Sequence, residues 1–193
     1  MISTTFLARK VVTGWSKGLL STSLNNKVAL VTGAGSGIGK AIARAFAESG
    51  AYVLVSDVSD SGQDVAEELQ GTFLQADLSS IDETRDLGLR ATELRGGVDI
   101  LVNNAGLQHI APVEEFPEET WAKLVQVMLV APFQLTKQVL TGMKQRGWGR
   151  IINMSSIHGV VASPYKSAYV SAKHGLIGLT KSVALEAGTY GVT

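Results

Sequence analysis

The stretch VALVTGAGSGIG, residues 28–39, decides the fold class of this chain. Val28–Thr32 is a short run of apolar and β-branched residues, which predicts a buried strand, and Ile38–Ser49 has the apolar spacing of a helix. The glycines between them are spaced G-x3-G-x-G, which allows a tight turn and lets backbone N–H groups approach an anion at the helix N-terminus. A strand, a glycine turn and a helix in this order predict the first unit of a parallel α/β sheet with a phosphate-binding turn.

Short apolar runs alternate with helical stretches along the rest of the chain. The further strands are expected at Tyr52–Asp57, Thr72–Ala76, Ile100–Asn103 and Arg150–Met154. Helices are expected over about Gly62–Gln70, from about Ile81, over one long stretch from about Pro117 to Gln145, and over about Ser167–Ala187. This alternation predicts an α/β fold, a Rossmann-type doubly wound parallel sheet with strand order 3-2-1-4-5, in a single domain spanning residues 27–193. Because a crossover helix normally returns to the sheet, the end at Thr193 predicts that later strands are absent and the domain is truncated.

Composition excludes several classes of function. Lys plus Arg equals Asp plus Glu at 17 each, so nothing in the charge favours nucleic acid or a membrane surface. No apolar run reaches the roughly 18 residues that span a bilayer. Cysteine is absent and the three histidines lack metal-ligand spacing, so we expect a soluble protein without a metal.

Residues 1–26 differ from the rest, because the first acidic residue of the chain is Glu48, while Arg9, Lys10 and Lys17 are basic. This composition is typical of an organellar transit peptide, and an ordinary disordered leader is the alternative. The expected location is cytoplasmic, or the mitochondrial matrix if this segment is a transit peptide.

Asp57 is expected to select the cofactor. It closes the second strand about 20 residues past the glycines, where a carboxylate accepts hydrogen bonds from ribose hydroxyls and repels a 2′-phosphate. Ser36 and Val58 are neutral, so no neighbouring cation offsets that repulsion, and the sequence predicts NAD rather than NADP.

The remaining cofactor contacts are expected where the third and fourth strands end. Asp77-Leu78 follows the third strand, where an adenine ring would lie, and Asn104-Ala105-Gly106 follows the fourth, where small residues permit backbone contact with ribose. The predicted cofactor-binding residues are Gly33, Ser36, Gly37, Ile38, Gly39, Asp57, Asp77, Leu78, Asn104, Ala105, Gly106, Tyr169 and Lys173.

Tyr169 and Lys173 lie four residues apart on the last helix and therefore share one face. Free tyrosine has a pKa of about 10, too high for a general base near neutrality, but an adjacent ammonium favours the phenolate. Ser156, thirteen residues before Tyr169, can hold the substrate oxygen; Ser155 is adjacent, so spacing alone chooses between the two.

TGAGSGIG, NNAG, a serine thirteen residues before a tyrosine, and YVSAK together resemble the short-chain dehydrogenase/reductase family from about Lys27 to the end of the chain. The resemblance implies that Ser156, Tyr169 and Lys173 are catalytic, with Tyr169 as the acid/base. It also implies a homo-oligomer, a dimer or tetramer formed through the two long helices.

One position departs from the family pattern. The family places an Asn seven residues after a tryptophan on the long helix, where its backbone carbonyl helps to hold a water that relays protons; here Trp121 is followed by Met128. Pro132 lies four residues later and has no N–H to donate to the Met128 carbonyl. We therefore expect that carbonyl to hold the relay water without the Asn side chain; the alternative is that Met128 is a core residue and the relay is impaired.

Within the family, GLQHIAPVEEFP and SSIHGVVASPYKSAY most resemble the (R)-3-hydroxybutyrate dehydrogenases. This resemblance assigns Gln108, His158 and Lys166 to the substrate carboxylate, beside Ser156 and Tyr169. The expected reaction is reversible oxidation of a 3-hydroxy acid to a 3-keto acid. The alternatives are another short-chain reductase acting on acyl-thioesters or sugars, and a catalytically weak fragment that binds nucleotide or partner subunits.

Overall fold

The computed structural model describes residues 23–193, so nearly all of the leader expected at residues 1–26 lies outside the described residues. Leu24 packs against the core, and its backbone N–H donates to the carbonyl of Ser49 at 2.8 Å. Packing against the domain therefore includes Leu24, which precedes the expected boundary at Lys27.

Five parallel strands form one sheet in the order β3-β2-β1-β4-β5, which confirms the predicted topology. The strands are β1 Val28–Thr32, β2 Tyr52–Ser56, β3 Thr72–Phe73, β4 Ile100–Asn103 and β5 Arg150–Asn153. β1 lies at the centre, where Val31 is in register with Val55 of β2 and Val102 of β4. Since a parallel sheet brings all its carboxyl ends to one edge, the loops that follow the strands meet there.

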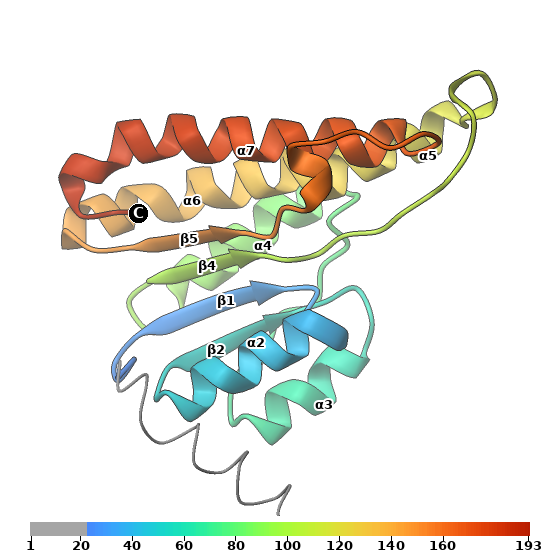
Figure 1. The fold of residues 1–193 in the computed structure, drawn as a ribbon. Helices are drawn as coiled ribbons and strands as arrows, with labels where there is room; N and C mark the ends of the chain where they lie inside the picture. Colours follow the sequence, from blue (N-terminus) through green and yellow to red (C-terminus); the bar gives the residue numbers. More distant parts are fainter. Residues whose placement is uncertain (1–22) are drawn as a thin grey trace, which may run out of the picture.

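Helices cover both faces of the sheet (Figure 1). α2 Gly37–Glu48 and α3 Ser61–Glu68 lie on one face. α4 Ile81–Glu93, α5 Glu118–Val125, α6 Ala131–Arg146 and α7 Ser167–Ala187 lie on the other. Successive residues of β1 alternate between the two cores, Ala29 and Val31 on the α2 side and Val28 and Leu30 on the α7 side, and all are buried. A sheet covered on both faces explains why β1 is apolar from Val28 to Val31.

The single long helix expected over Pro117–Gln145 is interrupted. Gln126–Val130 forms a π-helical turn between α5 and α6, in which the N–H of Ala131 donates to the carbonyl of Gln126. The cause is Pro132, which has no N–H to bond the carbonyl four residues before it, so the helix widens locally. The sequence prediction of one uninterrupted helix was therefore wrong at this turn.

β3 is shorter than the predicted Thr72–Ala76. Beyond Phe73 the chain still donates to β2, from the N–H of Leu74 to the carbonyl of Val55 and from that of Ala76 to the carbonyl of Asp57. The segment thus stays beside β2 and carries Asp77 to the carboxyl edge of the sheet.

Candidate active site

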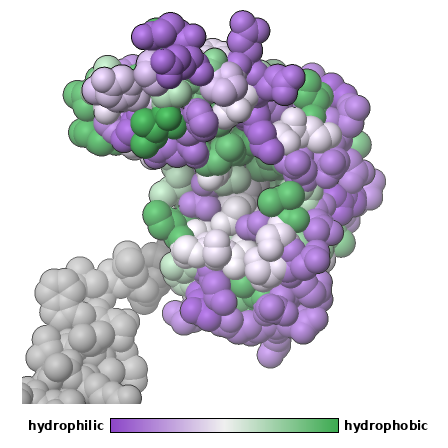
Figure 2. Space-filling model, turned by 90° about the vertical axis from the view of Figure 1, so that its right-hand side faces the viewer, coloured by the Kyte–Doolittle hydropathy of each residue, from purple (hydrophilic) through white to green (hydrophobic). Residues whose placement is uncertain are grey.

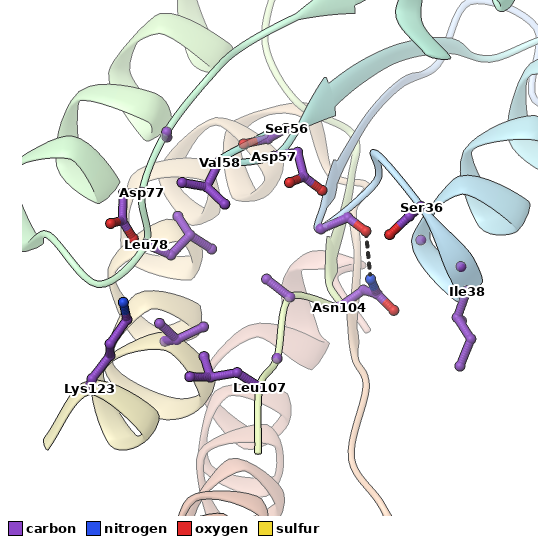
Figure 3. Close-up of a pocket in the computed structure, with 17 residues that line it drawn as sticks. Ser36, Ile38, Ser56, Asp57, Val58, Asp77, Leu78, Asn104, Leu107 and Lys123 are labelled. Carbon is purple, nitrogen blue, oxygen red and sulfur yellow. Dashed lines mark hydrogen bonds between the residues drawn. The ribbon is translucent and has the colours of Figure 1, made fainter. Parts of the chain in front are cut away.

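A cavity of about 540 Å³ lies at the carboxyl edge of the sheet, beyond the ends of β1 to β4. Figure 2, which looks onto that edge, shows the surface hollowed between an upper part and a lower part. Figure 3 shows side chains from several elements around the cavity. Its lining includes every predicted cofactor residue from the glycine turn, β2, the segment after β3 and the turn after β4: Gly33, Ser36, Gly37, Ile38, Gly39, Asp57, Asp77, Leu78, Asn104, Ala105 and Gly106.

The glycine turn forms an open anion cradle at the start of α2. Gly37 has a φ of 53°, and a Cβ built there would meet nothing within 4 Å, so its backbone faces open space. Gly39 is needed for a different reason, because a Cβ there would collide with the carbonyl oxygen of Gly33. The Ser36 side chain does not cap α2, and no acid lies in its first turn. These uncapped N–H groups at the positive end of a helix fit a pyrophosphate.

Asp57 lies between the glycine turn and the cavity. Its Oδ2 accepts a hydrogen bond from the N–H of Gly35 at 2.8 Å and its Oδ1 accepts one from the N–H of Ser59 at 3.0 Å. A Cβ at Gly35 would lie 2.9 Å from Oδ2, so glycine at this position lets the carboxylate approach the turn. The carboxylate is thus fixed beside the anion cradle, where it can accept from ribose hydroxyls.

The turn after β4 is tied to the glycine turn. The buried hydroxyl of Thr32 accepts hydrogen bonds from the N–H groups of Asn104 and Ala105 and donates to the carbonyl of Val102. The Asn104 side-chain amide donates to the carbonyls of Thr32 and Gly33 at 3.0 and 3.2 Å. Asn104 therefore holds the two turns together with its side chain, although it was predicted only as a cofactor contact.

A second hollow of about 370 Å³ continues from the cavity and contains the predicted catalytic pair. Tyr169 and Lys173 line it, and it shares Ile38, Asn104, Gly106 and Leu107 with the cofactor cavity. Lys173 is 5% exposed; its Nζ lies 5.6 Å from the centre of the Tyr169 ring and donates to the carbonyl of Met154 at 2.6 Å. Burial lowers the pKa of the Lys173 ammonium from its ordinary value of 10.5. The pair lies on the same side of the sheet as the turns that would hold a dinucleotide.

Ser155 lines this hollow, whereas Ser156 does not. The Ser156 hydroxyl caps the short helix Ile157–Gly159 by accepting from the N–H of His158 at 3.2 Å, and Ser155 Oγ donates to the carbonyl of Lys173 at 3.4 Å. The role of Ser156 as the serine that holds the substrate oxygen stays a prediction.

Alanine substitution of each serine tests which of the two holds the substrate oxygen. We expect Ser156→Ala to lower kcat by about 10²-fold, the usual cost of losing one donor to a reacting oxygen, and Ser155→Ala to lower it less. Steady-state rates of both variants, with equal thermal stability as a check on folding, make the comparison. A larger loss in Ser155→Ala would reassign the role to Ser155.

The residues predicted for the substrate carboxylate are only partly brought together. Gln108 lines the hollow with Tyr169. His158 lies edge-to-face against Tyr169, with ring centres 6.1 Å apart, and its Nδ1 is buried without a hydrogen-bond partner in the described part of the chain. Lys166 comes directly before α7, but its side chain does not line the hollow. The other two histidines pack elsewhere, His109 against Phe116 and His174 with its Nδ1 2.9 Å from the carbonyl of Val170.

Met128 lies in the π-helical turn and is 1% exposed. It packs beneath the turn after β4, since a Cβ built on Gly106 would lie 3.6 Å from the Met128 sulfur. Met128 is thus a core residue that supports a wall of both hollows. The expectation that its carbonyl holds a relay water stays a prediction.

Sequence reasoning missed Thr32 and Lys123. In the sequence Thr32 could be recognised only as the last residue of a strand, because its role depends on a turn 72 residues away along the chain. Lys123 lines the cavity from α5, and no predicted site residue on that helix pointed to it. Among residues 23–193, no group of three His, Cys, Asp or Glu side chains could hold a metal ion. In the same range, no helix has both the length and the hydropathy to cross a bilayer.

Comparison with known proteins agrees with this geometry. The chain is 48% identical over 176 residues to the D-beta-hydroxybutyrate dehydrogenase of Cupriavidus necator, a match that covers 88% of this chain and 68% of the relative. It is 45% identical over 175 residues to the protein of the same name from Rhizobium meliloti, covering 86% of this chain and 68% of that one. A crystal structure described as a putative NAD(P)-dependent gluconate 5-dehydrogenase from Beutenbergia cavernae, with bound NADP at low occupancy, is 36% identical. It superimposes with a TM-score of 0.83 over 88% of this chain and 70% of the other. The short chain dehydrogenase family model matches residues 27–193, and the chain belongs to this family of oxidoreductases.

Proposed function

We propose that the chain is an NAD-dependent oxidoreductase that interconverts a small 3-hydroxy acid, with 3-hydroxybutyrate as its substrate, and the corresponding 3-keto acid. One observation carries the proposal: the Tyr169–Lys173 pair and Gln108 line a hollow that opens into a cavity fitted to a dinucleotide. The relatives named D-beta-hydroxybutyrate dehydrogenase support the substrate class.

The residues around the glycine turn and Asp57 would hold NAD, whose nicotinamide ring would supply the hydride acceptor for the hydroxyl-bearing carbon. Tyr169 would take the hydroxyl proton as general base, with the Lys173 ammonium 5.6 Å from the centre of its ring. Ser156 would donate to the oxygen while it becomes a carbonyl. Gln108, His158 and Lys166 would hold the carboxylate, a task that suits a cation and two polar donors.

Purified protein incubated with NAD and (R)-3-hydroxybutyrate tests the proposal through NADH formation at 340 nm, with gluconate and a 3-hydroxyacyl thioester as comparison substrates. The proposal predicts the highest kcat/KM on 3-hydroxybutyrate. A preference for gluconate or for the thioester would instead assign the chain to another branch of the family, and tight NADH binding without turnover of any substrate would indicate a nucleotide-binding protein.

Cofactor choice has its own test, because the Beutenbergia structure holds NADP. Asp57→Asn keeps an oxygen that can accept from the N–H of Gly35 but removes the charge that would oppose a 2′-phosphate. We expect the ratio of NADPH to NADH affinity to rise about tenfold or more, as loss of about 1.4 kcal/mol of repulsion would give. Fluorescence titration of both cofactors measures it; a wild-type protein that already binds NADPH as tightly as NADH would overturn the assignment of NAD.

We further propose self-association through α5, α6 and α7, where Phe133 is 50% and Leu185 is 86% exposed.

The named relatives are bacterial, which supports a cytoplasmic location over the mitochondrial alternative.

A further inference from the structure

A separate cavity lies at the amino edge of the sheet, opposite the edge that carries the cofactor cavity. In Figure 1 this is the edge from which the strand arrows start. Its walls come from the starts of β1 and β2 and from the turns that follow α2 and α4. The cavity has a volume of about 350 Å³ and is lined by Asn26, Lys27, Val28, Gly50, Tyr52 and Arg95. It shares no residue with the cofactor cavity or with the hollow that contains Tyr169.

The charge of this cavity is positive. Lys27 and Arg95 both line it, and its lining contains no Asp or Glu. Within residues 23–193, neither cation has a carboxylate oxygen within 4.0 Å. Asp99, which accepts from the N–H of Val28 beside the cavity at 3.0 Å, is itself paired with Arg146 at 3.3 Å. The described part of the chain therefore leaves both positive charges of the cavity without a carboxylate partner.

Aromatic rings hold both cations in place. The guanidinium carbon of Arg95 lies 4.0 Å from the centre of the Tyr52 ring, and Lys27 Nζ lies 4.0 Å from the centre of the Trp148 ring. The Tyr52 ring is itself held by a hydrogen bond of 2.6 Å between its hydroxyl and the Thr72 hydroxyl. An aromatic face attracts a cation without neutralising its charge, and stacking leaves the N–H donors at the rim of a guanidinium free to bind a ligand.

Arg95 has a backbone conformation that long side chains rarely adopt. Its φ of 52° lies in the left-handed region, which glycine occupies without steric cost. Asn26 has a φ of 62°, so two of the four non-glycine residues with a left-handed backbone in residues 23–193 line this one cavity. Unfavourable conformations of this kind concentrate at functional sites, where the side chain is needed for another purpose than the fold.

We propose that this cavity binds a phosphate group of a small anionic molecule. The planar guanidinium of Arg95 suits two parallel hydrogen bonds to phosphate oxygens, and the Lys27 ammonium adds a compact second charge. The volume of the cavity falls within the range of small-molecule sites, about 300–1,000 Å³. The site does not depend on the proposed function, because it lies at the other edge of the sheet from the residues that would hold NAD.

Calorimetric titration with inorganic pyrophosphate tests the site, at constant ionic strength and with saturating NADH to occupy the anion cradle at α2. Wild-type protein should bind pyrophosphate with a Kd below about 1 mM. Arg95→Asn removes the charge and keeps a residue that tolerates the left-handed backbone, and Lys27→Gln removes the second charge. Each should raise the Kd about tenfold, the effect of one charge-assisted hydrogen bond. Lys137→Met, which removes an exposed lysine of α6 outside the cavity, should leave the Kd unchanged.

Thermal unfolding separates binding from a purely structural role of Arg95. If the guanidinium serves a ligand, the midpoint for Arg95→Asn should stay at or above that of the wild type, because relief of the backbone offsets the lost ring contact. A fall of more than about 4 °C would show that Arg95 stabilises the fold and would overturn the proposal. An unchanged Kd in either cavity variant, or the absence of saturable pyrophosphate binding by the wild type, would overturn it as well. Failure of NADH to bind would count against the proposed function alone, since pyrophosphate binding would still depend on Arg95.

Discussion

Replacement of Tyr169 by phenylalanine is expected to lower kcat about 10³-fold while leaving the Kd for NADH within about twofold. The substitution removes only the hydroxyl that would take the substrate proton. The ring remains to pack edge-to-face against His158 and beside the Lys173 ammonium. Because the ring supplies most of the packing, the midpoint of thermal unfolding should move by no more than a few degrees.

Tyr190→Phe is the matched control, because it removes the same atom from a tyrosine that packs against Lys144, outside both hollows. Its kcat should equal that of the wild type. A Tyr169→Phe variant that retains more than about a tenth of wild-type kcat would exclude this phenol as the acid/base, because general acid–base catalysis typically contributes at least about 10²-fold.

The sequence predicted those parts of the site that local pattern determines. The first four residues of β1, Val28 to Val31, are apolar because both faces of the strand are covered, and such a run is visible without coordinates. The turns after β1 and β4 could also be predicted from the sequence, because a turn that follows a parallel strand lies at the carboxyl edge of the sheet. The strand order and the gathering of the cofactor residues around one cavity follow from that order.

What the sequence did not predict depends on contacts between distant segments. Thr32 organises the turn after β4 through hydrogen bonds to residues 72 and 73 positions away, and no local pattern indicates such bonds. The sequence shows that Pro132 has no N–H to donate, but it does not show whether the helix then breaks or widens. The structure shows that it widens into a π-helical turn. Spacing favours Ser156 over Ser155, but it does not indicate that the Ser156 hydroxyl caps the short helix after β5 while Ser155 lines the hollow, so the choice between them stays a prediction.

Lys173→Met is expected to lower activity strongly without lowering the stability of the fold. Its Nζ donates to the Met154 carbonyl and lies beside the Tyr169 ring, so loss of the ammonium removes the positive charge beside the proposed acid/base. We expect kcat/KM to fall about 10³-fold. Replacement of a buried charge by an apolar side chain of similar length is often neutral or stabilising, so the variant should unfold at the wild-type temperature or above it. Lys181→Met, two turns further along α7 and exposed, should leave both quantities unchanged.

The burial of Lys173 and the catalytic role of its ammonium should give opposite pH dependences, one in stability and one in activity. Burial lowers the pKa of Lys173 in the folded state below the value of 10.5 that it regains on unfolding. Between those two values the unfolded chain binds more protons than the folded one, and therefore this residue makes the free energy of unfolding rise with pH across that window. Urea unfolding of wild type and Lys173→Met at several pH values up to 10.5 should show the rise in the wild type and a smaller one in the variant. Catalysis should have the opposite sign, because the ammonium beside Tyr169 is lost as the pH passes the lowered pKa of Lys173. Parallel stability curves for the two proteins would show that the ammonium is not held in a desolvated site, and the account of a lowered Lys173 pKa would then fail.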